Sequence, residues 1–379
     1  MKVLHVVPNY SPYIGGIESI VQDLANSQMA SGIEALVVFP DRLGKFPEEY
    51  EVDGVRVLTL QFSKQMLPLF MIGLPLPLKQ SPKAIAEIFS NCRKIVHAIM
   101  PDLVHIHTAS EMALPMVAVA KSMGIPIVFH LHGEFIDGSI KPAELRLLEN
   151  TNIVVTVSHA VERSVANYIK PGTKIFSVLN GLNIPEVSST YDYQKSMQII
   201  MAGRFAPEKG FPIGLSAFAS FLNLYPHATL KLVGNGPQRY ELQQLVQEIG
   251  IEKSVDFCGV LNRKELLLEC TKSFCAVVPS IGGEGFGLFA AEASSVGLPV
   301  VASNLGGLPE VIENNVSGIL VTPGKSPEIS AALSYLATNL VVHKNMGLAG
   351  RRNAIAKFSF NRFASEIEDI YRFALGEES

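Results

Sequence analysis

The chain has 379 residues, of which 48% are hydrophobic and 17% charged, and its formal net charge at pH 7 is −4. This length predicts about two or three domains, and a weakly negative charge without a basic run argues against a nucleic acid partner. No apolar run reaches the roughly 18 residues that a membrane-spanning helix needs, and we expect no signal peptide at the N-terminus. The four cysteines form no CxxC pair, so we expect buried reduced thiols in a cytoplasmic protein, at Cys92, Cys258, Cys270 and Cys275.

Short apolar strands alternate with helical patterns along the first half of the chain. They are predicted at 2–7, 34–39, 103–107, 125–132, 153–158 and 175–180. After the polar stretch 185–196 the alternation starts again, with strands predicted at 198–203, 228–234, 255–259, 274–279 and 299–303. Strands that alternate with helices form parallel sheets covered by helices on both faces. The sequence therefore predicts an α/β fold of two doubly wound, Rossmann-like domains.

The polar stretch and the restart of the pattern also suggest domain boundaries. We expect an N-terminal domain at 1–185 and a C-terminal domain at 186–361. A final helix at 362–379 is expected to pack back on the N-terminal domain. Because open parallel sheets bind ligands beyond the carboxyl ends of their strands, the expected site lies between the two domains.

A glycine-rich loop and a helix start follow the predicted strand at 274–279. The segment GGEGFGLFAAEASSVG places Glu284 in the loop and Glu292 about two turns into the helix. A helix N-terminus offers unpaired backbone N–H groups and the positive end of the helix dipole, which suit a phosphate. Two glutamates on either side of such a terminus indicate a long ligand with a phosphate in its middle.

The loop GRFAPEKG, after the strand at 198–203, carries two cations. The guanidinium of Arg204 and the ammonium of Lys209 are suited to a diphosphate, although two solvated surface cations would give the same pattern. No D-x-D sequence occurs that would hold a metal ion against a diphosphate. We therefore expect no metal cofactor, and we expect cations and helix N-termini to stabilise the charge of a leaving group.

Two other kinds of site were weighed. Residues 285–290 fit the dinucleotide-binding pattern G-x-G-x-x-A, but a loop after a late strand is unusual for an oxidoreductase. Two H-x-H pairs could bind zinc, but no acidic or cysteine ligand accompanies them on their apolar strands. We interpret His105, His107 and His130 as packed strand residues, whereas His132 ends its strand where the ligand is expected.

The motifs together resemble the retaining nucleotide-sugar glycosyltransferases of family 4, which have the GT-B fold. The resemblance is strongest in GRFAPEKG, LVGNGPQRYELQQL, VDFCG and PSIGGEGFGLFAAEASSVGLPVVASNLGGLPEVI, with the E-x7-E signature from Glu284 to Glu292. It extends to PNYSPYIGGIES, DLVHIHTA, HLHGEF, VSHAV and LNGLNIPEV in the first half. Asn183 replaces a frequent aspartate of the family and Leu182 a valine or isoleucine, which bears on the interdomain hinge.

The resemblance implies that the domain at 1–185 binds the acceptor and the domain at 186–361 binds the nucleotide-sugar donor. It also implies a role for each site residue. Glu284 would bind hydroxyls of the donor sugar and Glu292 the ribose, and His132 would lie beside the anomeric carbon. Arg204 and Lys209 would bind the diphosphate. The remaining donor-binding positions are backbone groups at Gly15, Gly16, Phe286, Gly287 and Leu288. The catalytic residues would be His132 and Glu284.

The expected reaction is transfer of a hexose or N-acetylhexosamine from a nucleotide sugar to a glycan or a lipid-linked saccharide. A UDP-sugar is favoured as donor, with a GDP-mannose-dependent mannosyltransferase as the alternative and a non-catalytic nucleotide-sugar-binding protein as the alternative of another class. The proline-rich apolar segment 62–82 is either a core-packed loop or an edge that contacts the membrane. In the second case a cytoplasmic enzyme would act at the inner face of the membrane.

Overall fold

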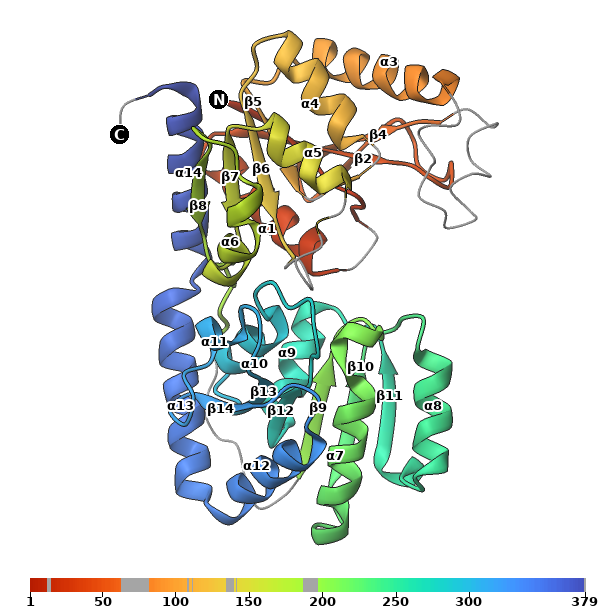
Figure 1. Cartoon of the computed structure of the whole chain (residues 1–379), viewed down its shortest axis with the longest axis vertical. Coiled ribbons are helices and arrows are strands. Elements are labelled where there is room, and N and C mark those ends of the chain that lie inside the picture. The colour runs from red at the N-terminus through yellow and green to blue at the C-terminus, as the bar shows by residue number, and fades with distance from the viewer. Residues whose placement is uncertain are drawn as a thin grey trace. The chain divides into compact units, whose positions relative to one another are not determined.

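The structure is a computed structural model. It describes residues 1–11, 15–62, 82–107, 109–110, 112–133, 140, 142–186 and 197–377. The chain divides into two compact units (Figure 1). The first unit comprises Met1–Val157, Glu162–Val178 and Ala364–Ser379, and the second comprises Ser158–Val161 and Leu179–Phe363.

The first unit is built on an eight-stranded sheet of order β3-β4-β2-β1-β5-β6-β7-β8. All neighbouring strands in it are parallel except β3 and β4, which are antiparallel. Its strands are β1 (Lys2–Val6), β2 (Glu34–Pro40), β3 (Glu49–Val52), β4 (Val55–Leu60), β5 (Leu103–His107), β6 (Ile127–Leu131), β7 (Ile153–Thr156) and β8 (Lys174–Ser177). Apart from Lys2 at the start of β1 and Thr156 at the end of β7, strands β1, β5, β6 and β7 consist of apolar residues and buried histidines, because both faces of a parallel sheet are covered.

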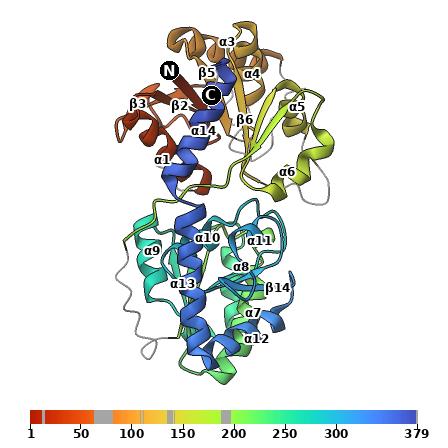
Figure 2. The ribbon, with the colours of Figure 1, turned by 90° about the vertical axis from the view of Figure 1, so that its left-hand side faces the viewer.

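Helices cover both faces of this sheet. α3 packs on α4 and α4 on α5, whereas α1 and α14 lie together on the opposite face, where Gln28 of α1 bonds Tyr371 of α14 (Figure 1, Figure 2). The helices are α1 (Gly16–Ala30), α3 (Pro82–Ile99), α4 (Ala113–Ser122), α5 (Pro142–Asn150), α6 (His159–Val165), the 3-10 turn η2 (Ala166–Tyr168) and α14 (Phe360–Leu375).

The second unit has a six-stranded parallel sheet of order β11-β10-β9-β12-β13-β14. Its strands are β9 (Gln198–Ala202), β10 (Thr229–Val233), β11 (Val255–Gly259), β12 (Cys275–Val278), β13 (Val300–Ser303) and β14 (Gly318–Val321). α7 packs with α8 and α12, and α10 packs with α9 and α13. The helices are η3 (Pro207–Lys209), α7 (Phe211–Leu224), α8 (Arg239–Glu248), η4 (Glu252–Ser254), α9 (Arg263–Lys272), α10 (Leu288–Ser295), α11 (Leu308–Val311), α12 (Ser326–Thr338) and α13 (Leu340–Lys357).

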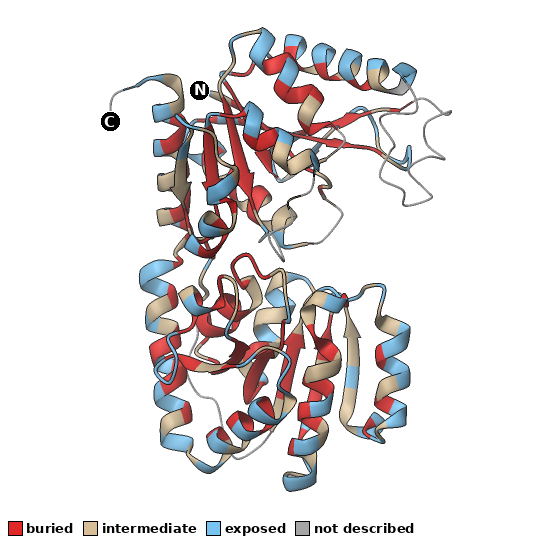
Figure 3. Ribbon diagram, in the orientation of Figure 1, coloured by how far each residue is buried: buried red, intermediate tan, exposed pale blue. Residues whose placement is uncertain are grey.

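Buried residues concentrate on the strands of both sheets (Figure 3). The core of the second unit is rich in phenylalanine: Phe205, Phe211, Phe218, Phe221 and Phe274 are all at most 2% exposed. The expected α/β class with two parallel, doubly wound sheets is thereby confirmed.

The four cysteines are free thiols, as the absence of a CxxC pair predicts. Cys92, Cys270 and Cys275 are buried, and burial raises the pKa of the Cys92 thiol to about 12. The expectation of burial is wrong for Cys258, which is only partly buried. It lies on β11, the edge strand of its sheet, where one side has no neighbouring strand to cover it.

Candidate active site

The strand order of the second unit brings two loops together. β9 and β12 are neighbours in the sheet, although 72 residues lie between the end of β9 and the start of β12. After β9 the chain continues toward one edge of the sheet, and after β12 toward the other. Such a switch point opens a crevice at the carboxyl ends of the two strands, where ligands bind in open α/β sheets. The loop after β9 leads to Lys209, and the loop after β12 leads to Glu284 and the start of α10.

Glu284 is held by side chains from both loops. Its carboxylate atom Oε2 lies 2.9 Å from the Lys209 ammonium and accepts a hydrogen bond from the Ser280 hydroxyl at 2.8 Å. Glu284 is 7% exposed. A buried carboxylate is costly unless it is paired and hydrogen-bonded, and Lys209 and Ser280 meet both requirements. Its backbone oxygen also accepts from the N–H of Gly307 at 2.9 Å. Both ends of this glutamate are thus fixed in place.

Two glycines allow the backbone to follow this path. Gly210 has φ +65°, and a side chain there would collide with the carbonyl oxygen of Pro279 in the loop after β12. Gly287 has φ +94° and is the residue before α10, where a side chain would meet Leu308 at 2.6 Å. Both positions need glycine, because other residues rarely adopt a left-handed conformation and neither site has room for a Cβ atom.

α10 begins directly after the loop and carries the second glutamate. No side chain caps the helix, so its first N–H groups keep the capacity to bind an anion. Glu292 is the fifth residue of α10, a little over one turn in rather than the two turns expected from the sequence. It is 7% exposed and lies 3.4 Å from the guanidinium of Arg263, the first residue of α9. The two glutamates therefore have different cationic partners.

The other predicted donor residues of this unit lie around the same strand ends. Arg204 is exposed in the loop after β9, and Leu288 is the first residue of α10. Phe286 is 3% exposed, and its ring packs edge-to-face on Phe358 at a centroid distance of 5.4 Å. The ring of Phe286 is therefore part of the core, and the use of its backbone amide by a ligand stays a prediction.

In the first unit, the predicted glycines start α1. Gly15 precedes the helix and has an extended backbone with φ −160°, so its conformation does not itself require glycine. A side chain at Gly15 would meet the carboxylate of Glu18, which folds back over this position, and Gly16 is exposed. Burial raises the pKa of Glu18. An acidic side chain therefore lies at the helix start where a diphosphate was expected to approach.

His132 directly follows β6 and is partly exposed. Its Nε2 atom lies 3.0 Å from Nδ1 of His107, which is fully buried on β5. Desolvation lowers the pKa of His132 to about 3, so its imidazole is neutral at physiological pH. A neutral imidazole has one donor and one acceptor nitrogen, and it can therefore orient a hydroxyl group.

The four strand histidines of the sequence pattern do come together, and a fifth joins them. Among the described residues, His5, His105 and His107 have ring nitrogens within 4.8 Å of one another, and so do His107, His130 and His132. Their rings are stacked or tilted over one another, with centroid distances from 3.9 Å for His105 and His107 upward. His5 was not singled out from the sequence, because a single histidine in the strand KVLHVV carries no pattern.

Comparison with known proteins identifies the family. Residues 14–185 match the family described as Glycosyltransferase Family 4, and residues 188–353 match the family described as Glycosyl transferases group 1. The chain belongs to the family 4 glycosyltransferases. Among relatives of this glycosyltransferase, the glycogen synthase of Mycobacterium tuberculosis is 23% identical over 398 residues, with 98% of this chain and 94% of the relative covered. The phosphatidyl-myo-inositol mannosyltransferase of Mycobacterium leprae is 26% identical over 387 residues, with 98% and 96% covered.

Solved structures show the same fold. Sucrose-phosphate synthase from Thermosynechococcus elongatus matches this glycosyltransferase with a TM-score of 0.83 at 20% identity, over 100% of both chains. The Anabaena protein HepE, solved in complex with UDP and glucose, matches with a TM-score of 0.75 at 21% identity, over 98% of this chain and 99% of that one. These neighbours are GT-B proteins, so the predicted fold type is confirmed. The pattern at residues 285–290 also fits a nicotinamide-dependent oxidoreductase, but the family matches indicate a glycosyltransferase instead.

Two residues of the candidate site were missed by the sequence analysis. Ser280 lies four residues before Glu284 in the same loop, and the hydroxyl in PSIGGE was the available signal. Arg263 lies 29 residues before its partner Glu292, and nothing in the sequence near either residue signals the pair.

The apolar segment 62–82 lies almost wholly outside the described residues. Phe62 before it is 8% exposed, and α3 begins at Pro82. Across the described ranges of this glycosyltransferase, no helix is both long enough and apolar enough to cross a membrane.

Proposed function

We propose that this glycosyltransferase transfers a hexose or N-acetylhexosamine from a nucleotide sugar to a glycan or lipid-linked saccharide, with retention and without a metal ion. The observation that carries the proposal is the placement of Lys209 and Glu284 beside the uncapped N-terminus of α10, at the carboxyl ends of β9 and β12. Phosphate groups bind at such a terminus, and a sugar attached to them would meet a buried carboxylate.

A division of labour between the glutamates follows from their partners. Lys209 neutralises Glu284 and, together with Arg204, presents positive charge at the strand ends. A diphosphate bound here would share the Lys209 ammonium, which leaves Glu284 able to accept hydrogen bonds from sugar hydroxyls. Glu292, paired with Arg263 one turn into α10, is placed to bind the ribose on the other side of the phosphates.

Retention is proposed to proceed by attack from the face of the leaving group. The bond between the anomeric carbon and the phosphate oxygen breaks, the acceptor oxygen bonds to that carbon, and the acceptor's proton moves to the departing diphosphate. Cations and helix N–H groups stabilise the diphosphate as its charge develops, which is the role a metal ion has in other transferases. His132 is proposed to lie beside the anomeric carbon, and Gly15 and Gly16 to approach the diphosphate.

The donor is proposed to be a UDP-sugar. Its support is the likeness to HepE, whose solved complexes contain UDP, and to UDP-binding neighbours of the same fold. GDP-mannose is the second candidate, favoured by relatives that are described as mannosyltransferases acting on phosphatidylinositol compounds. The names of these relatives also support an acceptor that carries a lipid. We propose that this glycosyltransferase meets such an acceptor at the cytoplasmic face of a membrane, with segment 62–82 as the contact.

The test is a panel of nucleotide sugars scored first by thermal shift and then by transfer. Free UDP and UDP-glucose should both raise Tm, because a ligand that binds only the folded state stabilises it. Glu292→Gln should weaken both ligands, whereas Glu284→Gln should weaken UDP-glucose and leave UDP within about twofold. Each substitution removes a charge-assisted hydrogen bond, so the expected loss is about tenfold or more in affinity.

A matched control is Glu310→Gln, since Glu310 caps a helix start through the N–H groups of His159 and Ala160 and is assigned no ligand. It should leave both affinities unchanged. Equal losses for UDP and UDP-glucose in the Glu284 variant would refute its assignment to the sugar. Binding of the sugar nucleotide without any hydrolysis or transfer across a broad acceptor panel would favour the non-catalytic alternative.

A further inference from the structure

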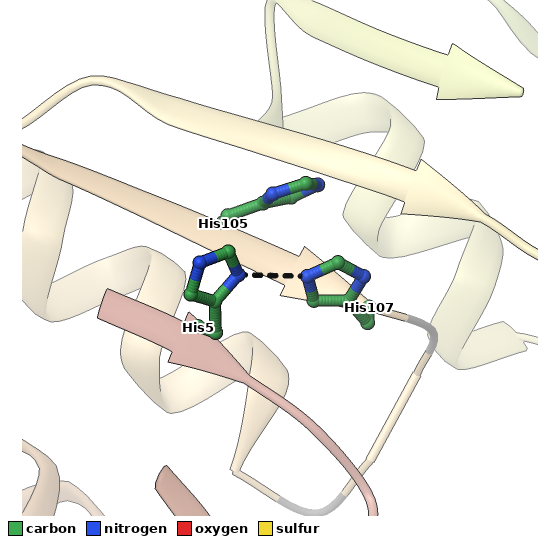
Figure 4. Close-up of side chains that lie close together, drawn as sticks. All are labelled: His5, His105 and His107. Carbon is green, nitrogen blue, oxygen red and sulfur yellow. Dashed lines mark hydrogen bonds between the residues drawn. The ribbon is translucent and has the colours of Figure 1, made fainter. Parts of the chain in front are cut away.

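A chain of hydrogen bonds runs from the partly exposed His132 into the core of the first unit. His132 Nε2 lies 3.0 Å from His107 Nδ1, and His107 Nε2 lies 3.0 Å from His5 Nδ1. His5 Nε2 in turn lies 2.8 Å from the amide oxygen of Gln28 on α1. Figure 4 shows the middle of this chain, with His5 of β1 and His107 of β5 joined through facing ring nitrogens and the His105 ring beside them.

Gln28 gives the chain a direction. Its amide oxygen can only accept, so His5 must carry its proton on Nε2 and present the Nδ1 lone pair to His107. His107 must then donate from Nε2 and accept at Nδ1, and His132 must donate from Nε2. Each neutral imidazole carries one N–H proton. The acceptor oxygen of Gln28 therefore places that proton on Nε2 in all three rings.

The other end of the amide supports this orientation. The Gln28 amide nitrogen donates to the hydroxyl of Tyr371 at 3.2 Å, and that hydroxyl lies 2.6 Å from Nδ1 of His105. The hydroxyl accepts from Gln28, and its own proton is then free to be donated to His105 Nδ1. His105 then carries its own proton on Nε2, which is buried against the ring of His107 at a centroid distance of 3.9 Å.

All members of the chain are neutral, which the assignment of protons requires. His5, His107 and Gln28 are each 0% exposed. Desolvation lowers the pKa of His5 to about 4 and the pKa of His107 well below its usual value, with neighbouring histidines adding to the effect at His107. An imidazolium has two donors and no acceptor, so a charged His5 or His107 would force the next ring toward His132 to accept a hydrogen bond instead of donating one.

We propose that Gln28 is a positioning residue that fixes the tautomer of His132 through His5 and His107. His132 is thereby held with its proton on Nε2, which points into the unit, and with a lone pair on Nδ1. A ligand meets it as a hydrogen-bond acceptor for a hydroxyl group and not as a donor. The use of this lone pair by a donor or acceptor sugar rests on the proposed function.

The arrangement favours a hydrogen-bonded chain over a metal centre at the same histidines. A metal ion would need the ring nitrogens to converge on one point at about 2.0–2.1 Å. Here the rings of His5 and His107 are stacked at an interplanar angle of 29°. Their facing nitrogens, His5 Nδ1 and His107 Nε2, form a hydrogen bond with each other and so do not converge on a common point. Binding of a metal would also replace the contact between these two rings.

The test is the tautomeric state of each histidine in the full-length protein, read by long-range ¹⁵N–¹H NMR after ¹⁵N-histidine labelling. The two nitrogens of a neutral imidazole give separate signals, and single His→Gln variants assign them. We expect His5, His107 and His132 all in the Nε2–H form. No ligand is needed, so a failure here is distinct from a failure of the proposed donor specificity.

Variants at Gln28 test the coupling. Gln28→Met removes the acceptor but keeps the length of the side chain, and the Nε2–H to Nδ1–H ratio should fall by about fivefold at all three histidines together. Gln28→Glu keeps an acceptor next to His5 and should retain the Nε2–H form. Leu24→Ala, equally buried one turn earlier on α1, should destabilise the unit without changing any tautomer.

Three results would overturn the proposal. One is a wild-type protein with His107 or His132 mainly in the Nδ1–H form. Another is a Gln28→Met protein in which His5 changes while His132 does not, since a continuous chain must change as a whole. The third is a zinc titration that shifts these signals in the wild-type protein at stoichiometric metal, which would make the histidines ligands. If Gln28→Met does not fold, the tautomers of His5, His107 and His132 in the wild-type and Gln28→Glu proteins still test the proposal.

Discussion

The buried histidines predict that the first unit loses stability in mild acid. His5, His105, His107 and His130 are all 0% exposed, and burial lowers the pKa of each. In the unfolded chain their pKa returns to about 6.5. Below that value the unfolded state binds protons that the folded state cannot, so the free energy of unfolding falls as the pH falls.

The loss in the free energy of unfolding at a given pH depends mainly on how far the histidines are protonated in the unfolded state. For His5, whose folded pKa is about 4, the loss is about 1 kcal/mol at pH 6 and about 2 kcal/mol at pH 5. Burial also lowers the pKa values of His105, His107 and His130 well below the usual one, so these three histidines act in the same direction. Because a typical domain is only about 5–15 kcal/mol stable, the first unit should lose a substantial part of its stability by pH 5.

His132, whose pKa desolvation lowers to about 3, acts in the same sense as the four buried histidines. Burial raises the pKa of Glu18, which acts in the opposite sense, but it is one carboxyl against four imidazoles. The second unit has one buried histidine of this kind, His343, whose pKa is lowered by desolvation. The first unit should therefore become unstable at a higher pH than the second.

Hydrogen exchange with mass spectrometry at pH 7.5, 6 and 5, corrected for the intrinsic pH dependence of exchange, separates the two units. Peptides from β1, β5 and β6 should lose protection between pH 6.5 and 5, while peptides from β9, β10 and β12 keep most of theirs. Urea midpoints followed by circular dichroism give the matching stabilities, since the chain has no tryptophan. Equal loss in both units, or no loss above pH 5, would refute the reasoning.

Three further predictions follow from particular contacts. Transfer activity should survive excess EDTA, and activity that returns only after Mg²⁺ or Mn²⁺ is added would contradict the proposed role of Lys209 and α10. Gly307→Ala would place a Cβ 2.7 Å from the Phe286 Cα atom, so it should cost about 1–3 kcal/mol of stability and weaken UDP binding, as thermal melts and titrations can measure. Asn262→Ala removes the capping box that Asn262 forms with Glu265 at α9 and should cost about 1 kcal/mol of stability, which urea midpoints can measure.

The parts of the fold that could be predicted from the sequence are those determined by burial of whole strands. β5 and β7 are continuously apolar or histidine-bearing because both faces of the sheet are covered, and such runs are legible without a structure. β3 was not predicted, because its sequence EYEV alternates charged and partly buried residues on an exposed edge next to β4. Local pattern gives little information about such a strand.

The candidate site was predictable as a set of positions but not as a set of pairs. The sequence indicates a phosphate-binding helix start and cations in a separate loop. The contact of Lys209 with Glu284 joins residues 75 positions apart, and it depends on β9 and β12 becoming neighbours. The sheet order is a property of the whole unit, so the choice of partner for each glutamate could not be read from its neighbours in the chain.

The split of the first unit along the chain has a consequence for synthesis. Residues from Leu179 to Phe363, nearly all of the second unit, leave the ribosome before the part of α14 that completes the first unit. Until Tyr371 arrives, Gln28 and His105 lack the hydroxyl that links them, and the first unit lacks the residues of α14 that are buried in the folded protein, such as Ile367 and Ile370. Since domains tend to fold as units during translation, the second unit is expected to be complete first, and the emerging N-terminal half would need protection from aggregation for the longest time.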